Sequence, residues 1–267
     1  QFMAIITLTT DFGDKDYYVS AVKGSVLSEL GEKVTLVDIS NHIPIFDVRN
    51  AAYILRKSFE TFPKGTIHIV GVDSEINAKT LPIIMEYKGH YFIGADNGLF
   101  SLIYDYPPEN LFELRIDINA NVLTFPTKDI FAKAACHIAR GGTPEIIGVR
   151  IKGIKSYQNP RPTTQEKFIR GTVIHIDSYG NAITNISKQV FAEIGKNRPF
   201  SIEFRNYDIK KLHTSYSAVV HEGEKLALFN TNNDLEISVN RGVEGYGGSA
   251  TNLLGLGLNE IVTVTFT

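Results

Sequence analysis

The sequence lacks several features that define large functional classes. It has one cysteine in 267 residues, Cys136, so it can form neither an internal disulfide nor a zinc cluster by itself. We interpret Cys136, within the apolar run FAKAACHIA, as a small core residue. The formal net charge is -2 and the basic residues are scattered, which leaves no basic stripe for a phosphate backbone. We therefore expect no nucleic-acid partner.

Long apolar runs and familiar catalytic strings are also missing. FMAIITLTT is too short to span a bilayer and lacks the basic start and cleavage pattern of a signal peptide. We expect a soluble cytoplasmic protein without a membrane partner. The seven histidines show no metal-ligand spacing, and His68 and His175 interrupt apolar runs as structural histidines do. With no G-x-G-x-x-G, P-loop or G-x-S-x-G string either, neither a metal nor a bound cofactor is expected.

The first half of the chain alternates strand and helix patterns. Continuous apolar runs at Ala4 to Thr10, Val34 to Ile39 and Thr66 to Val72 are typical of strands buried on both faces, which favours a mostly parallel sheet. Between them, apolar residues recur at helical spacing. These residues are Val19, Val22, Val26, Leu27 and Leu30 in the first segment, and Val48, Ala51, Ala52, Leu55 and Phe59 in the second.

The rest of the chain changes character. PIIMEY and HYFIGA flank Lys88-Gly89, which predicts an antiparallel hairpin, and a further helix is expected from Asp129 to Arg140. The proline-containing stretch KSYQNPRPTTQEK predicts a linker. After it, the short runs GTVIHIDSYG, FSIEFRN, SAVVHEGEKLALFN, LEISVN and EIVTVTF predict an all-β barrel-like domain. We predict an α/β domain at 1–154, a linker at 155–167 and a β domain at 168–267.

Polar motifs stand at the ends of the predicted strands of the α/β domain. TTDFG carries Asp11, GVD carries Asp73 and ADNGL carries Asn97. In an open α/β sheet, ligands bind at the carboxyl ends of the strands. Asp11 there can accept the hydroxyls of a ribose or merely cap the following helix. Asn97-Gly98 can equally be a simple turn.

A fourth motif lies in the predicted β domain. DSYGN, from Asp177 to Asn181, joins two strand patterns and is compatible with a plain hairpin. It also offers the Tyr179 ring for stacking on a base and carboxamides for reading the edge of that base. On its own the motif does not decide between the two.

Taken in order, these motifs resemble the family of S-adenosylmethionine hydroxide adenosyltransferases. The resemblance spans nearly the whole chain, since it also includes TFPTKDIFA at 124–132, LEISVN and SATNLLGLGLNEIV. It implies an N-terminal α/β domain, a C-terminal β domain and a homotrimer whose sites lie between neighbouring subunits. The implied reaction is displacement at the ribose C5′ carbon of S-adenosylmethionine. Water as the nucleophile gives adenosine and methionine, and halide in halogenase relatives gives the 5′-halo nucleoside.

The resemblance also implies roles for individual residues. Asp11 would hold the ribose hydroxyls, Phe46 would line the ribose and sulfonium, and Asp177 would pair with the methionine ammonium. Tyr179 would stack on adenine, with Asn181 hydrogen-bonding nearby. The segment from Thr231 to Arg241 would contribute mainly backbone contacts. The implied substrate-binding set is completed by Asn97, Thr231, Asn232, Val239 and Arg241.

The sequence departs from the family pattern at the catalytic positions. Hydrolases of the family carry an aspartate, an arginine and a histidine that position or activate water. Asp73 matches the aspartate, but the following loop reads SEINAKT, in which Lys79 offers a replacement for the arginine charge. Pro126 stands at the histidine position, and the neighbouring Thr127 has no basic lone pair at neutral pH. We take Asp73, Lys79 and Thr127 as the candidate catalytic residues.

Three functional hypotheses follow. The first is a divergent S-adenosylmethionine hydrolase in which Asp73 orients or deprotonates water. The second is a catalytically silent adenosyl- or nucleoside-binding protein, and the third is an enzyme that acts on another adenosyl substrate. Halogenation is disfavoured, because the Asp73 carboxylate would repel an incoming halide.

Overall fold

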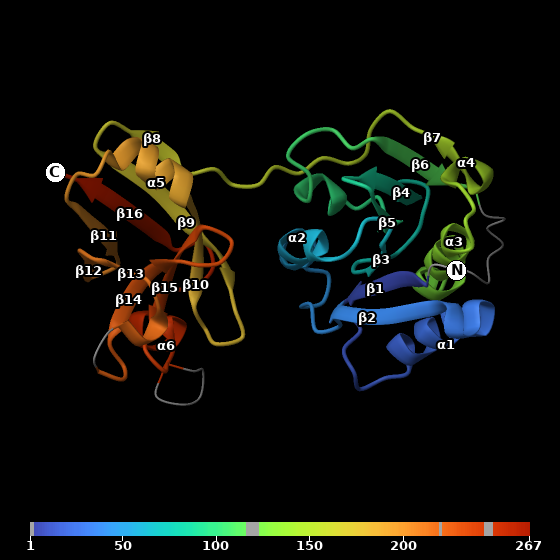
Figure 1. Cartoon of the computed structure of the whole chain (residues 1–267), viewed down its shortest axis with the longest axis horizontal. Helices are drawn as coiled ribbons and strands as arrows, with labels where there is room; N and C mark the ends of the chain where they lie inside the picture. The colour runs from blue at the N-terminus through green and yellow to red at the C-terminus, as the bar shows by residue number, and fades with distance from the viewer. Residues whose placement is uncertain (1–2, 116–122, 219–220, 243–247) are drawn as a thin grey trace. The chain divides into compact units, whose positions relative to one another are not determined.

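The structure, a computed structural model, describes residues 3–115, 123–218, 221–242 and 248–267. The chain divides into two compact units, Gln1–Gln158 and Asn159–Thr267, which we call unit 1 and unit 2 (Figure 1). Each unit has a sheet and a hydrophobic core of its own. The predicted fold class, an α/β domain followed by a barrel-like β domain, is confirmed.

Within the described residues, unit 1 contains a seven-stranded sheet in the order β2-β1-β3-β5-β4-β6-β7. The first four strands in this order are parallel, which the continuous apolar runs predicted for β1, β2 and β3. The other neighbours in the sheet are antiparallel. The strands are β1 (Ala4–Thr10), β2 (Val34–Ser40), β3 (Ile67–Gly71), β4 (Pro82–Tyr87), β5 (His90–Ala95), β6 (Asn110–Leu114) and β7 (Gly148–Arg150).

The predicted hairpin joins the parallel and antiparallel parts of this sheet. β4 and β5 pair antiparallel on either side of Lys88 and Gly89. Both turn residues have positive φ, 52° and 78°, as a two-residue hairpin turn of type I′ requires. The hairpin places β5 beside β3, so β5 ends at the same edge of the sheet as β1 and β3.

Helices cover both faces of the sheet (Figure 1). One core cluster combines α1 and α3 with Ile67 and Ile69, and the other combines α2 with Val70, because successive strand residues point to opposite faces. The α-helices are α1 (Tyr18–Leu30), α2 (Val48–Ser58), α3 (Ala132–Ala139) and α4 (Pro144–Ile147). Short 3-10 segments cover Gly31–Lys33, Phe59–Thr61 and Phe100–Leu102, and a π-helical segment covers Thr127–Phe131.

Two sequence-based expectations about the helices need adjustment. Leu27 was assigned to the buried face of α1, but its side chain is 48% exposed. The buried stripe of α1 consists of Val22, Val26 and Leu30 at four-residue spacing, and Leu27 lies beside that stripe. The helix expected from Asp129 begins two residues earlier, with the π-helical segment at Thr127. Cys136 is a core residue, as expected, with 1% exposure.

Two buried histidines, His68 and His90, stabilise unit 1 when their side chains are uncharged. His68 is fully buried on β3, where its Nδ1 hydrogen-bonds Thr7 Oγ1 at 2.7 Å and its Nε2 hydrogen-bonds His90 Nδ1 at 3.2 Å. Burial, followed by the charge of His90, lowers the pKa of His68 to about 3. Burial also lowers the pKa of His90. The prediction that His68 is a structural histidine agrees with this arrangement.

We therefore expect the protein to lose stability as the pH falls below 6.5. An unfolded histidine takes up a proton near pH 6.5, whereas folded His68 does so only near 3, so the stabilisation is complete above 6.5 and is lost progressively toward 3. Between pH 7.5 and 5, His68 alone should lower the free energy of unfolding by about 2 kcal/mol. Urea titrations at both values test this, with His42→Gln as an exposed control. An unfolding free energy independent of pH would contradict it.

Unit 2 is a barrel-like sheet in the order β12-β11-β16-β9-β10-β15-β14-β13, with β8 paired to β9. The strands are β8 (Thr163–Gln165), β9 (Phe168–Ile176), β10 (Ala182–Ser187), β11 (Phe200–Phe204), β12 (Tyr207–Ile209), β13 (Leu212–His213), β14 (Lys225–Phe229), β15 (Asp234–Val239) and β16 (Ile261–Phe266). Two short helices not expected from the sequence, α5 (Lys188–Gly195) and α6 (Ala250–Leu254), and a 3-10 turn at Tyr216–Ala218 accompany it.

The run SAVVHEGEKLALFN is less extended than expected. Ser217 and Ala218 belong to the 3-10 turn, and the strand is confined to Lys225–Phe229, while residues 219 and 220 lie outside the described residues.

In the part of the chain that the structure describes, no helix is long and apolar enough to cross a membrane.

Candidate functional site

Three predicted site residues of unit 1 meet at one edge of its sheet. Asp11 follows β1, Asp73 follows β3 and Asn97 follows β5, and these parallel strands are neighbours. Such an edge collects the carboxyl ends of the strands, where α/β proteins bind ligands. Hydrogen bonds link all three loops. The β-α-β pattern of the sequence brought Asp11 and Asp73 together, and the pairing of β5 with β3 adds Asn97.

Asp11 is the centre of this cluster. Its Oδ2 accepts the backbone N–H of Phe46 at 3.0 Å and of Asp73 at 3.2 Å. Both donors have positive φ, 64° and 43°, a conformation that costs a residue with a side chain roughly 1–2 kcal/mol. One carboxylate oxygen thus fixes two strained loops. Among the described residues, the other oxygen of Asp11 accepts no hydrogen bond.

Phe46 leaves its ring available beside Asp11. The side chain is 70% exposed although its backbone is held by the Asp11 carboxylate. An exposed aromatic ring on a fixed backbone can cover the apolar face of a ligand at low entropic cost. Because Asp47 caps the following helix α2 by accepting the Asn50 N–H at 3.0 Å, the loop that carries Phe46 is fixed at its other end as well.

Asn97 holds the backbone of the Asp73 loop. Its Nδ2 donates to the carbonyls of Val72 and Asp73, both at 3.0 Å, and its Oδ1 accepts the Leu99 N–H at 3.1 Å. The side chain is 9% exposed. A carboxamide used in this way orients Asp73, so the structure gives Asn97 a supporting function beside the predicted substrate contact.

The Asp73 carboxyl group is half-buried and lies among other carboxylates. Burial, then the charges of Asp11 and Glu75, raise its pKa, while the charge of Lys155 lowers it. A carboxylate with a raised pKa is a better proton acceptor than one in water. Asp73 therefore combines an unusual backbone conformation with the electrostatic environment of a general base.

Thr127 supports the same loop from the π-helical segment. Its hydroxyl donates to Ser74 Oγ at 3.2 Å, and the residue is fully buried. Gly71 makes room for it, since a Cβ at Gly71 would lie 2.9 Å from Thr127 Oγ1 and 3.2 Å from the Phe12 ring. This hydrogen bond connects Thr127 to Ser74, the residue that follows Asp73.

Lys79 lies in a tight turn on the surface. Asn77 Oδ1 accepts the N–H groups of Lys79 and Thr80 at 2.9 and 3.1 Å, and Asn77 pairs with Thr80 through its backbone. Within the described ranges, the Lys79 ammonium has no ion-pair or hydrogen-bond partner. The lysine that exerts a charge on Asp73 is Lys155, which the sequence analysis placed in the linker. No residue spacing connects positions 73 and 155, so only the fold reveals this pair.

In unit 2, the DSYGN motif forms a self-contained loop between β9 and β10. Asp177 Oδ1 accepts the N–H groups of Tyr179 and Asn181, both at 2.9 Å, and Oδ2 accepts Asn181 Nδ2 at 2.9 Å. Asn181 is 6% exposed, whereas Tyr179 is 63% exposed at the tip. Asp177 retains acceptor capacity on Oδ2, because a carboxylate oxygen can accept two hydrogen bonds.

The loop is seated on the start of α6. Gly180 has φ 76°, and a Cβ there would lie 2.4 Å from Ser249. The Gly180 carbonyl accepts both the N–H and the hydroxyl of Thr251 at 3.2 Å. A glycine is therefore required at this position, and the start of α6 holds the backbone next to Tyr179.

The other predicted residues of unit 2 divide between the two ends of β15. Ala182 pairs with Ile237, so the DSYGN loop lies at the end of β15 that carries Val239 and Arg241. Thr231 and Asn232 belong to the turn before β15, about 20 Å away along the strand. In that turn Asn230 Oδ1 accepts the Asn232 N–H at 3.0 Å. Unit 2 thus places Val239 and Arg241, but not Thr231 and Asn232, with Tyr179.

Arg241 and Val239 differ in exposure. Val239 is 3% exposed, so it offers a ligand little more than its backbone. Arg241 has φ 54°, and its guanidinium forms an exposed ion pair with Glu222 at 2.9 Å. An exposed ion pair of this kind contributes little to stability, which leaves the guanidinium available for another anionic group.

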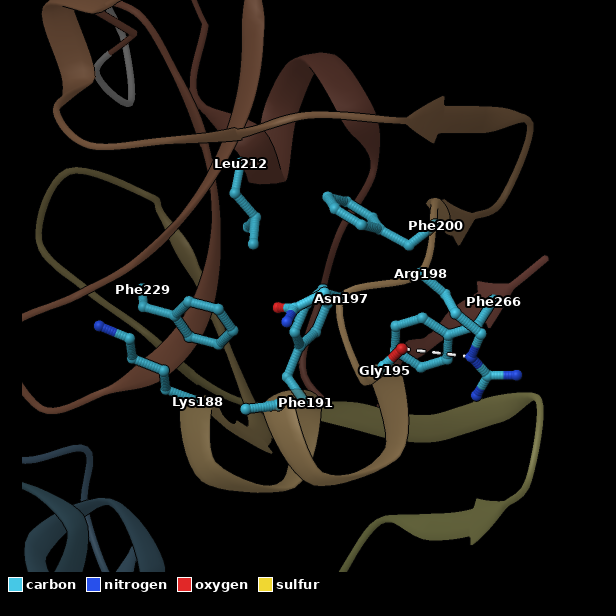
Figure 2. Close-up of a pocket in the computed structure, with 10 residues that line it drawn as sticks. Lys188, Phe191, Gly195, Asn197, Arg198, Phe200, Leu212, Phe229 and Phe266 are labelled. Atoms are coloured by element: carbon cyan, nitrogen blue, oxygen red, sulfur yellow. Dashed lines mark hydrogen bonds between the residues drawn. The ribbon is translucent and has the colours of Figure 1, made fainter.

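A separate aromatic pocket of about 380 Å³ lies in unit 2 (Figure 2). Phe200 comes from β11, and Leu212 and Phe229 come from β13 and β14. Strands from the two opposite ends of the sheet therefore line this pocket together. The Phe191 ring of α5 packs edge-on against Phe200, Phe229 and Phe266 at centroid distances of 5.2–5.4 Å. None of the predicted site residues lines this pocket, and it contains no carboxylate.

Comparisons with known proteins agree with the motifs. The family models described as SAM hydroxide adenosyltransferase N-terminal domain and C-terminal domain match residues 6–148 and 171–263. The chain is 31% identical to the (R)-S-adenosyl-L-methionine hydrolase of Methanocaldococcus jannaschii, covering 69% of this chain and 67% of the relative. It is also 31% identical to the hydrolase of the same name from Thermus thermophilus, covering 95% and 96%. A crystal structure of an uncharacterized conserved protein from Thermotoga maritima is similar with TM-score 0.85 and 25% identity, covering 98% and 99%.

Proposed function

This chain belongs to the SAM hydroxide adenosyltransferase family, and we propose that it hydrolyses S-adenosylmethionine to adenosine and methionine. The observation that carries the proposal is the Asp11 carboxylate, which ties Phe46 and the base candidate Asp73 together at the strand ends. The two relatives at 31% identity are named (R)-S-adenosyl-L-methionine hydrolases, which supports the same reaction for this chain.

The proposed step is a single displacement at C5′. The oxygen of a water molecule attacks the ribose C5′ carbon, the C5′–S bond breaks, and its electron pair remains on the sulfur of methionine. The water proton passes to the Asp73 carboxylate and then to solvent. Because a sulfonium is already a good leaving group, the protein needs mainly to align and desolvate the water. A half-buried carboxylate with a raised pKa suits that task.

Binding of the substrate is assigned to groups with spare acceptors or exposed rings. The second oxygen of Asp11 is the proposed acceptor for the ribose hydroxyls, and Phe46 covers the ribose. Asp177 Oδ2 accepts from the methionine ammonium, while Tyr179 stacks on adenine with Asn181 and the Val239–Arg241 backbone nearby. Thr231 and Asn232 stay predictions without a place in this cluster.

We further propose a homotrimer in which unit 1 of one subunit and unit 2 of its neighbour share each site. The proposal rests on the family resemblance and on the distribution of the acidic and aromatic groups over two separate units. A subunit that needs its neighbour's aromatic ring would be active only as an oligomer. Light scattering tests this directly, and a monomeric active enzyme would contradict it.

The test of the function is incubation with S-adenosylmethionine of each sulfonium configuration, followed by chromatography for adenosine and methionine. We expect equimolar adenosine and methionine from at least one epimer, and at least about 100-fold slower formation of both products by Asp73→Asn. Absence of both products with either epimer would remove the hydrolase proposal.

One observation favours a second candidate, a silent adenosyl-binding protein. Pro126 stands at the family's histidine position, and the neighbouring Thr127 is fully buried with its hydroxyl engaged by Ser74, so neither residue offers a basic proton acceptor. Calorimetric binding of S-adenosylmethionine or adenosine without product formation would select this candidate. Turnover of a different adenosyl compound in a substrate panel would select the third.

A further inference from the structure

The segment after β7 brings a lysine to the Asp73 loop. The Lys155 N–H donates to Asp96 Oδ1 at 2.8 Å, and the Lys155 ammonium donates to Thr80 Oγ1 at 3.0 Å. Asp96 follows β5, and Thr80 ends the loop that begins with Asp73. Lys155 therefore bridges the two loops that carry Asp73 and Asn97.

The backbone around Lys155 is fixed independently of its side chain. The Tyr157 N–H donates to Ser101 Oγ at 2.8 Å, and the Tyr157 ring packs so closely on Gly98 that a Cβ there would lie 2.4 Å away. The Arg49 guanidinium lies over the Tyr157 ring, 5.6 Å from the ring centroid. The position of the Lys155 Cα is thus set by packing, and the ammonium can be changed without releasing the segment.

Apart from Lys155, the charged groups that act on Asp73 among the described residues are negative. Asp11 and Glu75 both act on Asp73 and oppose its ionisation, and burial does so more strongly. The half-buried Asp96 carboxyl is a further acidic group of the same region. Burial raises its pKa, and the Lys155 N–H and ammonium oppose that rise, as the ammonium also does for Asp73. Among the described residues, Lys155 is the cation that acts on both.

We infer that Lys155 is a positioning residue of this site: its backbone N–H is anchored on Asp96, and its ammonium, held on Thr80, is the counter-charge of Asp73. The inference rests on the proposed function for its catalytic meaning. It assigns to Lys155 the charge that the sequence analysis had assigned to Lys79. The positive charge of this ammonium favours the ionised form of Asp73 against burial and the neighbouring carboxylates, and an ionised Asp73 is the form that accepts a proton from water.

The test follows the Asp73 carboxyl directly by ¹³C NMR titration of the full-length protein, with its signal identified by its loss in Asp73→Asn. In Lys155→Met the pKa of Asp73 should rise, and in Lys155→Arg, which keeps the charge, it should return toward the native value. Lys152→Met, which removes an exposed lysine of the same segment, is the matched control and should leave the titration unchanged. The acid limb of kcat/KM should move to higher pH in Lys155→Met alone.

The outcomes separate this inference from the function it rests on. An unchanged Asp73 titration in folded Lys155→Met would overturn it, as would a larger rise in Lys79→Met than in Lys155→Met. If Lys155→Met shifts the Asp73 titration but no variant hydrolyses S-adenosylmethionine, the electrostatic pairing stands and the hydrolase proposal fails. A melting curve for each variant verifies that the titrations compare folded proteins.

Discussion

Replacing Asp11 with alanine should reduce the affinity for S-adenosylmethionine or adenosine by about 100-fold or more. The change removes the proposed acceptor for the ribose hydroxyls, and hydrogen bonds to a charged group contribute roughly 1.5–3 kcal/mol each. It also releases the backbone of Phe46 and Asp73, which the carboxylate holds with positive φ. Binding should therefore weaken through lost contacts and through disorganised loops. Isothermal titration calorimetry measures the loss.

A matched variant separates these effects from a general change of charge. Asp14 lies three residues away with an 81% exposed side chain and only a 3.5 Å contact to His42, so Asp14→Ala should bind like the native protein. Asp11→Ala should also lower the free energy of unfolding by about 2 kcal/mol, because two N–H groups lose a charged acceptor. Native affinity in Asp11→Ala would refute the assignment of the nucleoside site to this edge of the sheet.

The Asp73→Asn variant should retain substrate binding and lose at least about 100-fold in kcat, the usual contribution of a general base. The carboxamide keeps the size and the backbone contacts of the loop but cannot take a proton from water. In the native protein, activity should fall with decreasing pH as Asp73 becomes protonated, and the midpoint should lie above the ordinary range of an aspartate, since burial and Asp11 raise the pKa. Adenosine release followed over a pH series measures both effects.

Glu75 provides the control for this interpretation. Its negative charge raises the pKa of Asp73, and its side chain is exposed. Glu75→Gln should therefore remain active at neutral pH, while its acid limb moves to lower pH. Equal kcat values in Asp73→Asn and the native protein would exclude proton transfer to Asp73.

The strand-end residues of unit 1 could be found from the sequence for a physical reason. Continuous apolar runs identify β1 and β3 as parallel strands, and parallel strands end at one edge, so Asp11 and Asp73 could be expected close together. Asn97 joins them because β5 of the predicted hairpin pairs parallel with β3, a pairing that the strand patterns do not specify. The hairpin at Lys88 and Gly89 was equally predictable, because its turn requires positive φ.

Other parts of the site depend on contacts that produce no periodic pattern in the sequence. Lys155 reaches Thr80 only because Asp96 and Ser101 fasten its segment to unit 1, and the composition of that segment indicates a linker. The separation of Asn232 from Tyr179 follows from the pairing of β10 with β15, a register that strand patterns alone do not specify. The positive φ values of Phe46 and Asp73 follow from the side chain of Asp11, so neither residue type indicates them by itself.

The contact between the DSYGN loop and the start of α6 has a consequence for how the sequence of this protein can diverge in evolution. The Tyr179 side chain is exposed, whereas the backbone of the neighbouring Gly180 is held against Ser249 and Thr251, about seventy positions later in the chain. Under the proposal that Tyr179 stacks on the base, homologous lineages can exchange this residue and alter base recognition without a change in Gly180, Ser249 or Thr251. Selectivity and loop geometry would then be encoded in separate stretches of the polypeptide.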